Sequence, residues 1–131
     1  MTDFDTQTLS IEDPEFVLRV LGTLPRAICT ASEAQDIAAQ CGEEQALCFA
    51  CEDGMFVVRL QPLGDDLELF VLAAVGFVSH GAFERQEPAV LAIARDLGAD
   101  TVAFRARRRG WGRMLGPEWS RRGTDEFVRG V

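Results

Sequence analysis

The sequence contains no lysine, no tyrosine and no asparagine, and it has a single histidine among its 131 residues. Without lysine or tyrosine, the chain has no amine or phenol side chain to serve as a catalytic acid, base or nucleophile. No apolar run approaches the ~20 residues that a membrane-spanning helix needs. The first residues, MTDFDTQ, are acidic and lack the basic region of a signal peptide. We therefore expect an intracellular protein with no membrane segment.

Apolar residues make up 47% of the chain, which is typical of a folded globular protein. A length of 131 residues fits one domain with a core of its own. We therefore predict a single domain over residues 1–131, in which residues 1–9 are flexible.

Charge is distributed unevenly along the chain. Residues 1–100 hold 18 acidic residues and 5 arginines, whereas residues 101–131 hold 3 acidic residues and 8 arginines, and the net charge is −8. Six of those arginines and both tryptophans lie in RRRGWGRMLGPEWSRR, residues 107–122. This segment is suited to binding an anion or a partner. Alternatively, its arginines pair with the acidic body inside the fold or across a subunit interface.

Two amphipathic patterns in the N-terminal third predict helices. In SIEDPEFVLRVLGTLP, Asp13 is a suitable N-cap and Pro25 is expected to end the helix. In TASEAQDIAAQCG, Thr30 and Glu33 have the spacing of a capping box, and Gly42 is the expected C-terminal stop.

The middle of the chain predicts strands. ALCFACEDGMFVVRLQP reads as a hairpin with Asp53-Gly54 at its turn. LELFVLAAVGFV is almost wholly apolar, which is typical of a central strand covered on both faces. FERQEPAVLAIARDLGAD predicts a third helix with Pro88 in its first turn, Leu97 on its buried stripe and Gly98 as its stop.

TVAFRAR then predicts a strand parallel to the central one, because a strand, a helix and a strand of these lengths form a right-handed crossover. GWGRMLGPEW allows at most a short helix, and SRRGTDEFVRGV is expected to close with a strand. The predicted order is α-α-β-β-β-α-β-(α)-β. We therefore predict an α/β fold with a mixed α+β sheet that is antiparallel in its N-terminal part and contains one parallel crossover.

The order of elements, and the segments LELFVLAAVGFV, EPAVLAIARDLGADTVAFRAR and GWGRMLGPEWSRRGTDEFVRG, resemble the GNAT superfamily of N-acetyltransferases. The likeness covers about half the chain, from Leu67 to Val131, and is greatest to small GNAT-like proteins encoded by tailed bacteriophages. It implies a GNAT-like fold, and an acetyl-CoA site at a loop of the form Q/R-x-x-G-x-G/A after the central strand. In GFVSHGAFERQ, Gly81 matches the first glycine, whereas Val78 and Phe83 stand at the positions of the basic and second small residues.

Several polar residues are candidates for chemistry. His80 follows the central strand, where open α/β sheets bind ligands, and it is a candidate general base together with Glu84 and Glu68. Cys48 and Cys51 form a C-x-x-C, a spacing that zinc sites use. Residues an odd number apart on a strand point to opposite faces, so we favour buried free thiols and expect no metal.

Two functions follow from the resemblance. The first is a non-catalytic structural or assembly component of a virion, with no cofactor, which contacts other phage proteins or itself. The net negative charge argues against nucleic acid as a partner. The second is an acetyl-CoA-dependent N-acetyltransferase, in which Gly81 and Ala82 hold the pyrophosphate and His80 or Glu84 is the base. The protein would then work in the host cytoplasm or the virion. The candidate partner contacts are Arg107, Arg108, Arg109, Trp111, Arg113, Trp119, Arg121 and Arg122.

Overall fold

The structure is a computed structural model that describes the backbone of residues 9–77, 82–106 and 115–131, and their side chains except those of residues 82–85. Along the chain the elements are β1 (Ser10–Glu12), α1 (Pro14–Leu21), α2 (Ala31–Gly42), β2 (Leu47–Cys51), β3 (Gly54–Leu63), β4 (Asp66–Gly76), α3 (Ala82–Asp96), β5 (Thr101–Arg105), β6 (Ser120–Arg122) and β7 (Glu126–Gly130).

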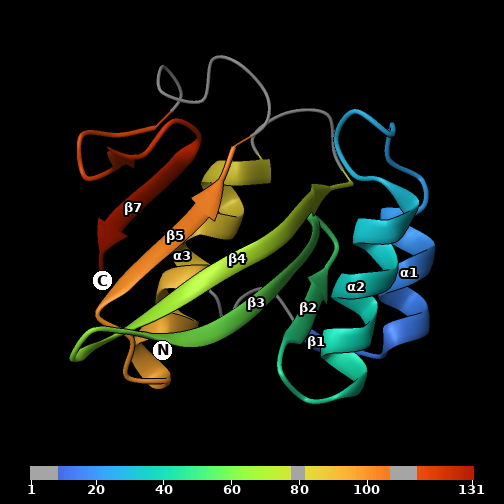
Figure 1. The fold of residues 1–131 in the computed structure, drawn as a ribbon, viewed down its shortest axis with the longest axis horizontal. Coiled ribbons are helices and arrows are strands. Elements are labelled where there is room, and N and C mark those ends of the chain that lie inside the picture. The colour runs from blue at the N-terminus through green and yellow to red at the C-terminus, as the bar shows by residue number, and fades with distance from the viewer. Residues whose placement is uncertain (1–8, 78–81, 107–114) are drawn as a thin grey trace.

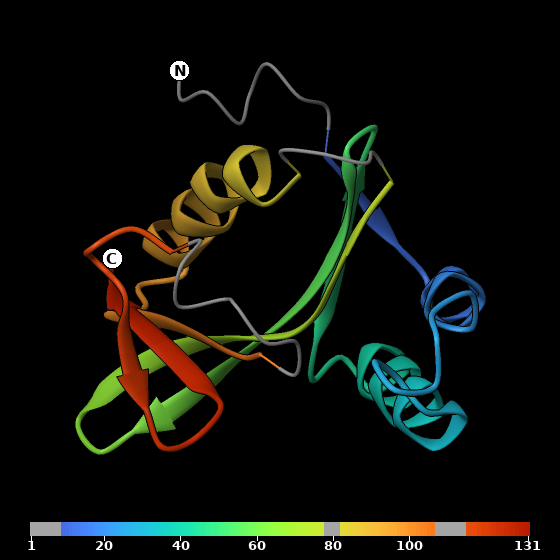
Figure 2. The same cartoon turned by 90° about the horizontal axis from the view of Figure 1, so that it is seen from above.

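The strands form one mixed sheet of order β1-β2-β3-β4-β5-β7-β6 (Figure 1). Only β4 and β5 are paired in parallel within the described residues, and the connection between them contains α3. Helices α1 and α2 lie on one face of the sheet and α3 lies on the other (Figure 2). The predicted α/β class, the antiparallel N-terminal part and the parallel crossover are therefore confirmed.

Two short strands were not predicted. β1 pairs with β2, and β6 forms a hairpin with β7, so the described order has a strand before α1 and one more near the C-terminus. Each is three residues long, which is too short to show a period of two in the sequence. Residues 115–119 form turns and no helix, and residues 110–114 of the predicted short helix lie outside the described residues.

The first two helices begin where their caps predict. The Asp13 side chain accepts a hydrogen bond from the Phe16 N–H at 2.9 Å. At α2, Thr30 Oγ1 accepts from the Glu33 N–H at 3.1 Å, and Glu33 Oε1 accepts from the Thr30 N–H at 3.0 Å, which confirms the capping box. The predicted end of α1 at Pro25 is wrong, because the helix ends at Leu21 with Gly22 as its C-cap.

The third helix begins earlier than predicted. Because α3 starts at Ala82, Pro88 lies inside the helix and not in its first turn. The prediction that Leu97 lies on the buried stripe is wrong, because Leu97 follows the last helical residue and is 40% exposed. Gly98 has a φ of +78°, a left-handed conformation that favours glycine and ends the helix as expected.

Each face of the sheet has its own hydrophobic core. The core under α1 and α2 includes Val17, Leu21, Cys48, Met55 and Val57. The core under α3 is built from residues of β3, β4, α3, β5 and the connection before β5: Phe56, Val58, Leu69, Ala89, Val90, Ile93, Ala94, Ala99 and Val102. Along β3, Phe56 and Val58 alternate with Met55 and Val57, so this strand is covered on both faces.

Candidate functional site

Strands β4 and β5 separate toward their carboxyl ends. They pair from Glu68 and Thr101 up to Val71 and Phe104, while β4 continues to Gly76 alongside β3 (Figure 1). The separation begins at a bulge, because Val57 and Val58 of β3 pair with Ala73 and Val71, which leaves Leu72 between them. We call this place the fork. Ligands of α/β sheets bind where neighbouring parallel strands diverge, so the fork is a candidate site.

The β4 side of the fork is fixed by a close approach of three segments. A Cβ atom on Gly54 would lie 2.1 Å from the Val75 carbonyl oxygen and 2.3 Å from Gln86 Nε2. Gln86 is buried in α3, and its amide lies 3.5 Å from the same carbonyl. Only glycine fits at position 54, and Gln86 thereby ties the end of β4 to α3. Gly54 is the first residue of β3, so the predicted hairpin is confirmed with its turn one residue earlier, at Glu52 and Asp53.

The residues predicted to perform chemistry at the fork are only partly placed. His80 and Gly81 lie outside the described residues. Ala82 is the first residue of α3, and Glu84 belongs to the first turn of α3, but its side chain is not described. The first amides of a helix have no partner within it, so the start of α3 supplies N–H groups to this region.

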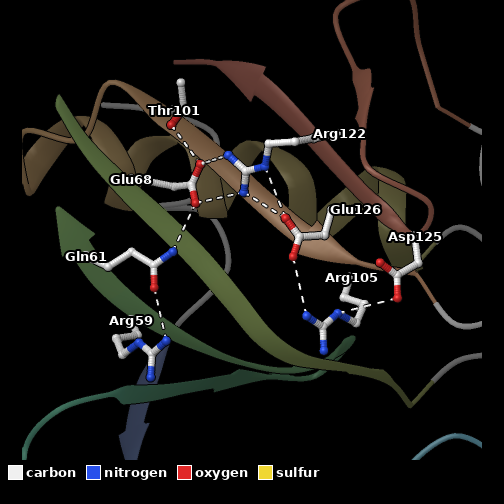
Figure 3. A network of polar contacts seen from close by, with 8 residues as sticks. All are labelled: Arg59, Gln61, Glu68, Thr101, Arg105, Arg122, Asp125 and Glu126. Carbon is white, nitrogen blue, oxygen red and sulfur yellow. Dashed lines mark hydrogen bonds and ion pairs between the residues drawn. The ribbon is translucent and has the colours of Figure 1, made fainter. Parts of the chain in front are cut away.

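Glu68 lies at the opposite end of the parallel pair and is completely buried. Arg122 Nη1 and Nη2 donate to Glu68 Oε1 and Oε2 at 2.7 and 3.0 Å, a bidentate ion pair (Figure 3). Gln61 Nε2 and Thr101 Oγ1 donate to the same carboxylate at 3.0 and 3.3 Å. These bonds, the one from Arg122 first, lower the pKa of Glu68 despite its burial. The carboxylate is thus held by four donor atoms and its pKa is lowered, which disfavours Glu68 as the general base that the sequence suggests.

Arg122 extends this network to the C-terminal hairpin. Its guanidinium also donates to Glu126 Oε1, and hydrogen bonds to both carboxylates raise the pKa of Arg122. Arg105 lies 3.4 Å from Glu126 and 3.5 Å from Asp125 (Figure 3). In the sheet, β5 and β7 separate β6 from β4. The hairpin therefore curls back over the sheet (Figure 2). The ion pair between Arg122 and Glu68 joins β6 to β4 (Figure 3).

The other described members of the arginine and tryptophan segment also contact their own chain. Trp119 Nε1 donates to Glu87 Oε1 at 2.8 Å, and its ring packs edge-on against Phe104. Arg129, which lies beyond this segment on β7, pairs through Nη1 with the same Glu87 at 3.2 Å. Arg121 is exposed and lies over the Phe127 ring.

Of the predicted partner contacts, Trp119 and Arg122 are thus turned inward, which supports pairing of the basic tail with the acidic body. Arg121 stays exposed, and the other five candidates lie outside the described residues: Arg107, Arg108, Arg109, Trp111 and Arg113.

The cysteines are free thiols. Cys48 is buried in the core under α1 and α2, and burial raises its pKa to about 12, so it is a poor nucleophile. The prediction of burial holds for Cys48, whereas Cys29, Cys41 and Cys51 are only partly buried. Within the part of the chain that the structure describes, no group of three or more His, Cys, Asp or Glu side chains is arranged to hold a metal ion.

An apolar groove was not anticipated from the sequence. It has a volume of about 310 Å³, lies between β1, β2 and α3, and is lined by Leu9, Ile11, Leu47, Phe49, Ile93, Asp96 and Leu97. Ile11 is 68% exposed, which is unusual for an isoleucine. The groove depends on β1, and the three-residue strand gave no signal in the sequence.

None of the described helices is long and apolar enough to cross a membrane. No protein-family model matches the sequence, and a search of curated proteins finds no significant match.

Proposed function

We propose that the chain is a GNAT-like, phage-encoded protein that works without catalysis, as a structural or assembly component associated with the virion. The GNAT relationship is supported by the sequence resemblance and by an architecture compatible with it, a mixed sheet with one parallel crossover through α3. The assembly role is supported by the apolar groove, which is the observation that carries this proposal.

The groove has the features of a protein contact surface. Ile11, Leu47 and Leu97 keep 68%, 40% and 40% of their surfaces exposed side by side around it. Exposed apolar surface of this kind is removed from water when a partner binds. β1 is also the last strand of the sheet on that side, and within the described residues its outer edge has no neighbour. A partner strand can therefore pair with β1 while its apolar side chains enter the groove.

Sedimentation equilibrium of the purified protein tests the simplest form of this role, self-association. We expect the wild-type chain to associate and Ile11→Asp to remain monomeric, because a charge at the groove must be desolvated. Leu63→Asp is the matched control, since Leu63 is 45% exposed but lies at the turn between β3 and β4, away from the groove. Equal association of the wild type and Ile11→Asp would remove the groove as the contact surface.

The fork favours a second candidate, acetyl-CoA-dependent N-acetyl transfer. In this hypothesis the amides of Gly81 and Ala82 bind the pyrophosphate at the start of α3, and His80 or Glu84 removes a proton from the accepting amine. Water would return a proton to the leaving thiolate, because the chain has no tyrosine. The divergence of β4 and β5 supports this reading, because within the described residues β4 has no parallel partner beyond Val71.

Calorimetric titration with acetyl-CoA separates the two candidates. Micromolar binding favours the enzyme, and no binding at millimolar ligand favours the structural role. Gln86→Leu should weaken binding at the fork, because it releases the end of β4 from α3. Gln35→Leu, at an exposed position of α2, is the matched control and should leave binding unchanged.

A further inference from the structure

Arg59 is a partly buried cation whose partners are neutral. It lies on β3, on the same face of the sheet as Glu68, and its Nη1 donates to Gln40 Oε1 of α2 at 2.8 Å. Its Nη2 donates to Gln61 Oε1 at 3.0 Å (Figure 3). Both acceptors are amide oxygens, so neither cancels the charge of the guanidinium.

The other partly buried arginines differ in this respect. Arg122 contacts the carboxylates of Glu68 and Glu126, and Arg129 contacts that of Glu87. Within the described residues, no carboxylate lies within ion-pair distance of Arg59. A guanidinium removed from water normally takes an anionic partner, because an unpaired charge is costly to bury. The position of Arg59 therefore suits an anion that comes from outside the chain.

The two glutamines hold the guanidinium in place from different elements. Gln61 is itself oriented, since its Nε2 donates to Glu68 while its Oε1 accepts from Arg59. The carboxylate of Glu68 accepts in turn from the two Nη atoms of Arg122, so Glu68 forms its ion pair with Arg122 and not with Arg59. This chain of contacts positions Arg59 before any ligand arrives, which reduces the ordering cost of binding.

We propose that Arg59 is the anchor of a binding site for a small carboxylate that carries an apolar body. A guanidinium has five N–H donors in a planar fork, and the two bonds to Gln40 and Gln61 leave donors for a carboxylate. The cross-strand partner of Arg59 on β4 is Phe70, which is partly exposed and provides an apolar neighbour for such a body. This inference goes beyond the proposed assembly role and depends on neither the groove nor the fork.

Benzoate is a suitable probe, with acetate and inorganic phosphate as comparisons and sodium chloride at equal ionic strength as the blank. The readout is the chemical shift of the backbone amides of Gln61 and Phe70 in ¹⁵N-labelled protein. We expect saturable shifts with benzoate in the millimolar range and weaker binding of acetate, which lacks an apolar body. Saturation by phosphate but not by benzoate would overturn the carboxylate assignment.

Variants identify the anchor. Arg59→Gln should weaken benzoate binding by about tenfold or more, a loss of about 1.4 kcal/mol. Arg59→Lys should bind with intermediate affinity, since lysine keeps the charge but not the planar donors. Arg95→Gln, an exposed position on α3 at the other face of the sheet, should bind as the wild type does.

Gln40→Leu keeps Arg59 but removes one of the two amide oxygens that position its guanidinium, so it should weaken benzoate binding in a protein that remains folded. This variant replaces Arg59→Gln as the test if Arg59→Gln fails to fold. Two results would overturn the proposal. One is an unchanged midpoint in Arg59→Gln or, if that variant does not fold, in Gln40→Leu. The other is the absence of saturable shifts in the wild type beyond those caused by sodium chloride.

Discussion

The two halves of the sheet are closed on the same face by different means. Over β2 and β3, helices α1 and α2 cover an apolar core in which Val17, Met55 and Val57 are fully buried. Over β5 and the Glu68 end of β4, no helix of the described residues covers this face, and the C-terminal hairpin curls back over it (Figures 1 and 2). This curl places Arg122 on Glu68. One half is therefore closed by burial of apolar surface and the other by an ion-pair network.

This difference has consequences for stability. Burial of apolar side chains is non-directional and does not depend on protonation. The pairing of Glu68 with Arg122 depends on geometry and on the ionised carboxylate. Removal of either partner leaves the charge of the other without compensation, which lowers the free energy of unfolding. The N-terminal half should therefore respond to lost volume, and the C-terminal half to lost charge. Substitutions that act on one half at a time test this division.

The largest effect is expected in the N-terminal half from Leu21→Ala. Leu21 is 1% exposed at the end of α1, so truncation leaves a cavity under the helix and should lower the free energy of unfolding by about 2–5 kcal/mol. Urea denaturation at pH 7 measures the loss. Leu18→Ala is the control, because Leu18 on the same helix is 43% exposed and should lose far less. Similar losses in both variants would contradict a core beneath α1.

Arg122→Met should be the most damaging substitution in the C-terminal half. It removes the partner of a carboxylate with no exposed surface while it keeps most of the length of the side chain. Removal of one partner from a fully buried pair costs about 3–5 kcal/mol, and because Arg122 is 34% exposed we expect about 2 kcal/mol.

Arg121→Met, on the same strand, is the matched control. Arg121 is exposed, donates locally to the Thr124 carbonyl and lies over the Phe127 ring, so its loss should change the free energy of unfolding by at most about 1 kcal/mol. If the two variants unfold at the same urea concentration, the ion pair does not close this half of the sheet.

The pH dependence of stability should originate largely from Glu68 in this half. Its pKa in the folded state is lowered from 4.5, chiefly by the hydrogen bond from Arg122. A lowered folded pKa means that the stabilisation is present above about pH 4.5 and is lost as the pH falls through the folded pKa. Urea midpoints of the wild type should therefore fall below that pH.

Glu68→Gln removes this titration. Its urea midpoint should be lower than that of the wild type at neutral pH and should change less on acidification. Glu44→Gln, at an exposed position after α2, should retain the slope of the wild type. Parallel curves for the wild type and Glu68→Gln would show that acid acts elsewhere.

The same division explains what the sequence could predict. Caps, apolar stripes and turn residues are local signals, so the capping box of Thr30 and Glu33 and the Gly98 stop were found from residues a few positions apart. The long apolar run of β4 also predicted its central place in the sheet correctly, although the face of β4 near Glu68 is covered by an ion pair and not by a helix.

The partners of Arg122 could not be predicted in this way. Arg122 and Glu68 are 54 residues apart in sequence, and only the curl of the hairpin brings them together. β1 and β6 are three residues each, so the groove beside β1 and the inward position of Arg122 on β6 depend on pairing with distant strands. The sequence also predicts Trp119 as a contact for another protein. Its hydrogen bond to Glu87 of the same chain could not be predicted, because the two residues are 32 positions apart.

The smallest effect is expected from the cap of α2. Thr30→Ala removes the hydroxyl that accepts from the Glu33 N–H, and loss of such a cap lowers the free energy of unfolding by about 1 kcal/mol. Ser32→Ala, an exposed position inside the same helix, should be close to neutral.

Hydrogen exchange shows which part of the protein loses stability in Thr30→Ala. Amides of α2 should exchange faster in Thr30→Ala, while those of β5 and β7 keep their protection, since the helix closes only the N-terminal half of the sheet. Equal acceleration in both halves would show that the two halves of the sheet unfold as one cooperative unit. The halves would then differ in the interactions that cover them but not in their order of unfolding.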